Sequence, residues 1–189
     1  MPLLHERYWL AAFWVLVVGS WVFGVAHGRW ISNEGFFLDL SQAVRISDPA
    51  EFDAWWQPFV YFIFTVVAAF VLSQLFFGAG AAIFLFARGV YDSTLIAKLE
   101  ITIGGWSLPD LPMDEICMVL LVFLILGVNL PLCLWAAHLG GQRSAYMLQR
   151  IRGKPVKPEL GTRPFSQFLI ILAVSIALGL IASLLFSYT

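Results

Sequence analysis

The amino-acid sequence predicts an all-α protein, a polytopic transmembrane helical bundle of about five spans, and two observations support this fold class. Of the 189 residues, 60% are apolar and 12% are charged, whereas soluble domains carry about 25% charged residues. Several uncharged stretches also reach the roughly 20 residues that a helix needs to cross about 30 Å of hydrocarbon. Because hydrocarbon offers no hydrogen-bond partners to the backbone, we expect these stretches to be helical.

Three of the spans are uncharged stretches of about the length that one crossing needs. A longer stretch, residues 57–87, is uncharged over 31 residues and would form a helix about 46 Å long, which exceeds one crossing. Gly78 and Gly80 stand where this helix is expected to break, because glycine relaxes a helix locally. The predicted spans are residues 9–28, 57–77, 82–103, 116–139 and 168–188, all within a single membrane domain of residues 1–189.

The charged residues outside the spans indicate how the chain is threaded. Residues 140–165 form a predicted loop that is mostly basic, and the positive-inside rule places such a loop in the cytoplasm. Residues 29–56 form a predicted acidic external loop with a short amphipathic helix. Five crossings satisfy both assignments, with a cytoplasmic amino terminus and an external carboxyl terminus. We therefore expect a multi-pass protein of the cell (plasma) membrane with five spans, four spans being the alternative.

Charged and polar side chains inside the spans are the candidate site residues. Arg88 and Asp92 are four residues apart, which places them on one face of a helix. Charges at this depth are costly and face either a partner or a cavity. The pair therefore either lines a path for an ion or substrate or neutralises itself as a structural pair. Asn129 interrupts a span beside Pro131, which predicts a kink that the asparagine repairs by pairing across helices.

Small residues mark the faces where helices are expected to approach each other closely. Ser175, Gly179 and Ser183 recur at every fourth position of the last span, and this spacing lets two helix backbones come together. We expect the contact to be within the chain, and a contact with another chain is the alternative. Gly78 and Gly80 are assigned to helix packing for the same reason.

A group of basic residues lies in the predicted cytoplasmic loop and is a candidate contact for anionic lipid or for an acidic partner. The alternative is that these residues act only as a topology signal. The group consists of Arg143, Arg150, Arg152, Lys154 and Lys157.

The sequence contains no recognisable constellation of catalytic residues, so we expect no catalysis, no metal site and no cofactor. His27 and His138 are predicted to end two spans and could in principle bind haem, which is kept as a second alternative to a structural role. Cys117 and Cys133 would lie about 24 Å apart along one helix. That separation is too long for a disulfide, so both are predicted to be packing residues.

The middle and the end of the chain resemble the stage II sporulation protein M family of multi-span membrane proteins. The resemblance rests on Phe77-Gly78-Ala79-Gly80-Ala81 followed by Phe86-Ala87-Arg88-Gly89, and on the closing run from Leu180 to Thr189. It covers about residues 57–189. This resemblance implies a non-catalytic component of about five spans that works in an envelope-remodelling or other membrane assembly.

Together these observations predict a non-catalytic integral membrane subunit or scaffold of a larger membrane assembly. Its expected partners are the lipid bilayer and other membrane proteins or copies of itself, with no nucleic acid. The first alternative is a transporter or channel component in which Arg88 and Asp92 line a path. The second alternative is a haem-binding electron-transfer subunit.

Overall fold

The computed structural model describes residues 2–31, 52–104, 112–153 and 159–188, and no strand occurs among them. This confirms the all-α fold class. The helices are α1 (Pro2–Ile31), α3 (Gln57–Gln74), η2 (Leu75–Gly78), α4 (Ala79–Gly104), α5 (Met113–Phe123), the π-helix η4 (Leu124–Asn129), α6 (Leu130–Ile151) and α7 (Glu159–Phe186).

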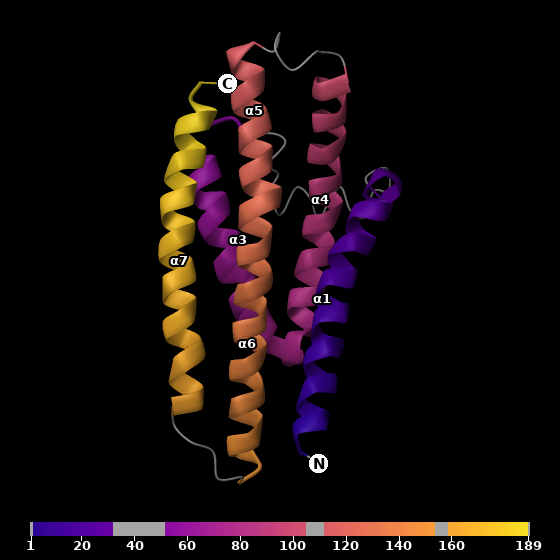
Figure 1. Cartoon of the computed structure of the whole chain (residues 1–189), viewed down its shortest axis with the longest axis vertical. Helices are drawn as coiled ribbons and strands as arrows, with labels where there is room; N and C mark the ends of the chain where they lie inside the picture. Colours follow the sequence, from indigo (N-terminus) through magenta and orange to yellow (C-terminus); the bar gives the residue numbers. More distant parts are fainter. Residues whose placement is uncertain (1, 32–51, 105–111, 154–158, 189) are drawn as a thin grey trace.

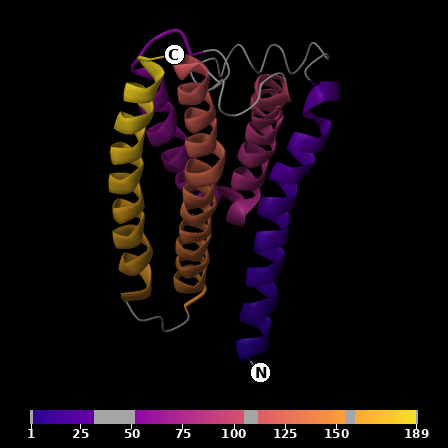
Figure 2. The ribbon, with the colours of Figure 1, turned by 45° about the horizontal axis from the view of Figure 1, so that its top comes forward.

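Five segments of the described chain are long and apolar enough to cross a membrane. Four of them correspond to α1, α3, α4 and α7, and the fifth runs without interruption from Met113 to Ile151 through α5, η4 and α6. The segments alternate in direction along the bundle, so that α1 begins at one end and α7 finishes at the other (Figures 1 and 2). This alternation agrees with the predicted five crossings.

The break between α3 and α4 lies where the glycines predicted it. Gly78 has a φ of 101°, a left-handed conformation that an L side chain rarely adopts. A Cβ atom on Gly80 would lie 2.5 Å from the carbonyl oxygen of Leu72. Glycine at both positions therefore allows the chain to reverse tightly between two spans.

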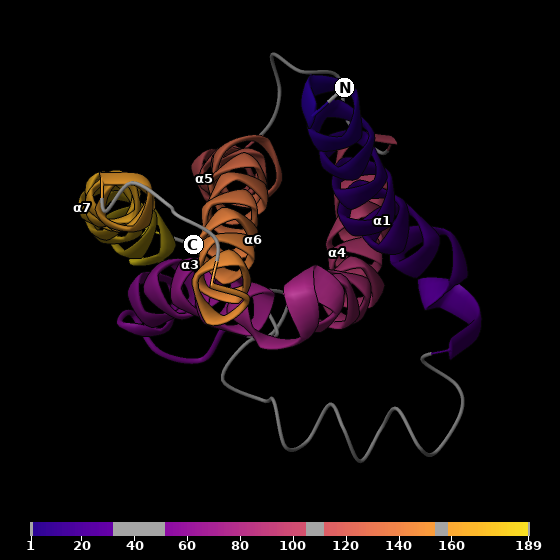
Figure 3. The same cartoon turned by 90° about the horizontal axis from the view of Figure 1, so that it is seen from below.

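Helix α1 packs along α4, at a distance that only glycine permits. A Cβ atom on Gly24 would lie 2.3 Å from the carbonyl oxygen of Phe86, and one on Gly89 would lie 3.1 Å from the Cα atom of Gly24. Gly24 and Gly28 are four residues apart, the small-xxx-small spacing of closely packed membrane helices. Figure 3 shows α1 and α4 side by side, with the group formed by α3, α6 and α7 on the other side of the bundle.

Helix α7 packs on α3 through the predicted face of small residues. Ser175 Oγ donates a hydrogen bond to the carbonyl oxygen of Phe62 over 2.7 Å, and Ser183 Oγ accepts one from the backbone N–H of Phe59 over 3.2 Å. Between them, a Cβ atom on Gly179 would lie 3.2 Å from the Cα atom of Phe59. This face is therefore used within the chain, as expected.

The prediction of a loop over residues 140–165 is wrong at both ends. Helix α6 continues to Ile151 and α7 begins at Glu159. The basic stretch after Gly141 is rich in Gln, Arg, Ala, Met and Leu, which are good helix formers, and contains no proline before position 155. The basic charge of this stretch therefore did not predict its backbone conformation. Residues 154–158 lie outside the described part.

The other predicted loop, residues 29–56, is only partly described. Helix α1 continues to Ile31, and α3 begins at Gln57 with a proline in its first turn. The short amphipathic helix expected in this loop lies outside the described residues.

The five-crossing arrangement makes a topology prediction. A reporter fused after Thr189 should face the side opposite to one inserted after Gly153, because one spanning segment, α7, separates the two positions. Paired fusions that report alkaline phosphatase activity outside and green fluorescence inside would measure this. Both reporters on the same side would contradict the arrangement.

Candidate functional site: a buried polar network

The charged pair predicted on one helix face is an ion pair inside the bundle. On α4, the Arg88 Nε atom lies 3.3 Å from Asp92 Oδ2, and the two residues are 4% and 0% exposed. Asp92 Oδ2 also accepts a hydrogen bond from the indole Nε1 of Trp21 on α1, over 2.8 Å. The pair therefore links α4 to α1 within two of the segments that are long and apolar enough to cross a membrane.

The other two guanidinium nitrogens of Arg88 donate hydrogen bonds to the continuous helix formed by η4 and α6. Nη1 donates to the thiol sulfur of Cys133 on α6 over 2.9 Å, and Nη2 donates to the carbonyl oxygen of Ile125 over 3.1 Å. The guanidinium carbon also lies 5.6 Å from the centre of the Tyr61 ring, a cation–π distance. Arg88 thus joins both groups of helices through one side chain.

The π-helix η4 supplies the carbonyl that Arg88 uses. The backbone N–H of Leu130 bonds to Ile125 O, five residues back, which is the wide turn of a π-helix. Pro131 follows directly and has no backbone N–H to donate. The predicted disturbance at Pro131 is therefore a π-helical turn, and the carbonyl of Ile125 accepts from Arg88 as well as from Leu130.

Asn129 extends the network to α3 and α7. It is fully buried, and its Oδ1 accepts a hydrogen bond from Thr65 Oγ1 over 3.1 Å and a longer one from the Cys133 thiol over 3.7 Å. Its Nδ2 donates to the Phe62 carbonyl over 3.4 Å, which also accepts from Ser175 on α7. The predicted cross-helix role of Asn129 agrees with this geometry.

We call this set the buried polar network, and it takes a group from each of the five spanning segments. Its members are Trp21, Phe62, Thr65, Arg88, Asp92, Ile125, Asn129, Cys133 and Ser175. The charges of Arg88 and Asp92 cancel, and Oδ1 of Asp92 is the one carboxylate oxygen of the pair that accepts no hydrogen bond in the described part of the chain. Polar bonds of this kind hold transmembrane helices together where hydrophobic attraction is absent.

The two histidines considered as haem ligands are engaged in separate contacts. His27 on α1 lies against the Phe23 ring, with 4.0 Å between ring centres. His138 stacks on Trp14 of α1 at 5.3 Å and hydrogen-bonds to Gln142 over 2.9 Å. The prediction that His138 ends a helix is wrong, because α6 runs thirteen residues farther, to Ile151. No group of three or more His, Cys, Asp and Glu side chains suited to a metal ion occurs among the described residues.

The predicted basic contact residues divide into three kinds. The guanidinium of Arg143 lies over the ring of Phe165 on α7, 5.2 Å from its centre. Arg150 and Arg152 are exposed at the end of α6. Lys154 and Lys157 lie outside the described residues.

The comparisons with known proteins found no match, so any functional proposal rests on the structure itself. No family model matches the chain, and neither a curated protein nor a solved structure matches it.

Proposed function

We propose that the protein is a non-catalytic integral membrane subunit that holds other proteins of a membrane assembly. The observation that carries the proposal is the projecting end of α6, where exposed apolar side chains lie beside arginines. Figure 1 shows α6 extending well past the turn between α3 and α4. We call residues 142–153 the α6 projection.

From the length of the helix we infer that this projection extends beyond the lipid. A helix needs about twenty residues to cross the hydrocarbon. If the crossing begins at Ile116, its twentieth residue is Trp135. The sixteen residues from Ala136 to Ile151 then add about 24 Å, whereas the headgroup layer on one side is only about 5–8 Å thick. Ile151 is therefore proposed to stand in water rather than among headgroups.

The chemistry of the projection suits a protein partner. Ile151 is 83% exposed and Met147 is 44% exposed, and the two are four residues apart on one helix face. Contiguous apolar patches exposed to water mark interaction sites. Arginine is enriched at such interfaces, and Arg150 and Arg152 flank Ile151. Positive charge favours a partner segment that is acidic and carries apolar side chains. The acidic residues Asp53, Asp114 and Glu115 lie toward the other end of the bundle, near the starts of α3 and α5, and the occupant that we propose is a partner protein rather than a second copy.

The alternative in which Arg88 and Asp92 line a path has less support. Both side chains are covered, and the contacts described above bind them to α1, η4 and α6. A structural role explains these contacts without a substrate.

The proposal extends to location and orientation. The positive-inside rule places the α6 projection in the cytoplasm, and with it the amino terminus. A cell (plasma) membrane location and the resemblance to the stage II sporulation protein M family stay predictions. Both fit a subunit that recruits a cytoplasmic partner to a membrane assembly.

Purification from native membranes in mild detergent tests the proposed function. We expect a partner at a near-stoichiometric ratio, lost from the double variant Met147→Ser/Ile151→Ser, because this change removes the apolar contact without touching the buried core. Met113→Ser is the matched control, since Met113 is 73% exposed at the opposite end of the same continuous helix. A wild-type protein that purifies alone, or equal recovery with both variants, would overturn the proposal.

A further inference from the structure

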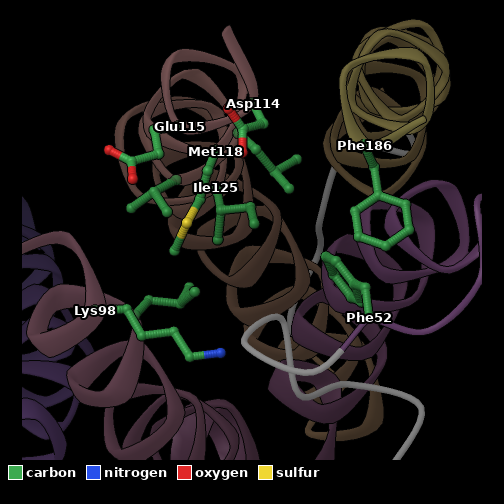
Figure 4. Close-up of a pocket in the computed structure, with 10 residues that line it drawn as sticks. Phe52, Lys98, Asp114, Glu115, Met118, Ile125 and Phe186 are labelled. Atoms are coloured by element: carbon green, nitrogen blue, oxygen red, sulfur yellow. The ribbon is translucent and has the colours of Figure 1, made fainter. Parts of the chain in front are cut away.

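A pocket of about 220 Å³ lies between α4 and α5, toward the end of the bundle opposite the α6 projection. Figure 4 shows α4 contributing Lys98 on one side, α5 contributing Asp114, Glu115 and Met118 on another, and the rings of Phe52 and Phe186 on a third. No residue of the buried polar network other than Ile125 lines it. The pocket is therefore a separate feature of the fold.

The pocket changes from charged to apolar along its depth. From Asp114 to Ile125 its α5–η4 wall covers eleven residue steps, or about 16 Å of helix. Beyond the first turn of α5 this wall is apolar, with Leu121 and Ile125, and α4 adds Leu95. An apolar cavity of 150 Å³ holds one benzene molecule. A pocket of about 220 Å³ therefore has room for an apolar group about one and a half times as large as benzene.

The charged end of the pocket favours a positive ligand. Asp114 and Glu115 carry two negative charges, and Lys98 carries one positive charge on the facing helix, which leaves one net negative charge. Phe52 and Phe186 stand edge to face with ring centres 5.9 Å apart. Aromatic faces attract ammonium groups through their electrons. Carboxylates and aromatic rings around one apolar cavity are the combination that recognises an organic ammonium ion.

We propose that this pocket binds a small amphiphilic organic ammonium ion, with its apolar body between α4 and α5 and its charged group at Asp114 and Glu115. The proposal does not depend on the proposed function, because it concerns the opposite end of the bundle.

The test uses three probes that share one fluorinated body and differ in charge. They are para-fluorophenethylammonium, the corresponding para-fluorophenylpropanoate and the neutral para-fluorophenethyl alcohol. Fluorine NMR titration of the full-length protein in nanodiscs of zwitterionic lipid measures binding, and empty nanodiscs correct for partition into lipid. We expect saturable binding of the ammonium that is at least about tenfold tighter than that of the carboxylate. Absence of saturation, or equal affinity for the two ions, would overturn the proposal without any variant.

Matched variants then locate the ligand. Glu115→Gln should weaken ammonium binding about tenfold, and Met118→Trp should abolish it by filling the pocket. Asp53→Asn removes a charge outside the pocket, and Met113→Trp adds an indole to the exposed face of the same helix. Both controls should bind as the wild type does. Equal losses in control and pocket variants, or unchanged affinity in Glu115→Gln and Met118→Trp, would contradict this location.

Discussion

Replacing Asp92 by leucine is expected to destabilise the protein more than any other single change discussed above. Arg88 is only 4% exposed, and the change leaves its buried guanidinium without a counter-charge. The change also removes the acceptor of the hydrogen bond from the Trp21 indole. Loss of one partner of a buried ion pair costs about 3–5 kcal/mol. We therefore expect Asp92→Leu to lower the free energy of unfolding by about that amount, measured by denaturant titration in detergent micelles.

The matched control for this change is Asp53→Leu. Asp53 is exposed near the start of α3, so the same substitution there should change the free energy of unfolding by about 0.5 kcal/mol or less. Equal stability of the two variants would show that Asp92 has no structural role in the network.

Replacing Gly89 by valine is expected to separate α1 from α4. A Cβ atom at position 89 would lie 2.4 Å from the carbonyl oxygen of Trp21 and 3.1 Å from the Cα atom of Gly24, and neither backbone can give way alone. Overpacking costs about 1–3 kcal/mol, and displacement of α1 also breaks the bond from Trp21 to Asp92. We expect a total loss of about 3 kcal/mol, measured by the same titration.

Gly19→Val is the control for this prediction because it makes the same change in the face of α1 where a Cβ atom would meet nothing within 4 Å. It carries the same gain in helix propensity, because valine is a better helix former than glycine. If Gly19→Val and Gly89→Val lose equal stability, the close approach of α1 and α4 is not what holds the pair together.

Local features of the fold could be predicted from the sequence because they depend on neighbouring residues. The length of each apolar stretch indicated the spans, Gly78 and Gly80 indicated the reversal, and the spacing of Arg88 and Asp92 indicated one helix face. The small residues of α7 indicated a packing face for the same reason. None of these inferences needed knowledge of which helices are neighbours.

The partners of Arg88 could not be predicted, because they depend on that knowledge. Trp21 is 71 residues from Asp92 in sequence, and Cys133 is 45 residues from Arg88. In lipid every apolar helix face resembles the others, so hydropathy does not select neighbours. The spacing of Gly24 and Gly28 was the available signal for the α1–α4 contact, and the sequence interpretation did not use it.

A double-mutant cycle on Arg88 and Asp92 tests most directly the central claim that this pair stabilises the bundle by mutual compensation. The singles are Arg88→Met and Asp92→Leu, and the double variant replaces the buried pair by apolar side chains, a change that is often neutral. We predict that the double variant is more stable than Asp92→Leu alone, with a coupling energy of about 3 kcal/mol. Additive losses, with the double variant less stable than either single, would contradict the claim.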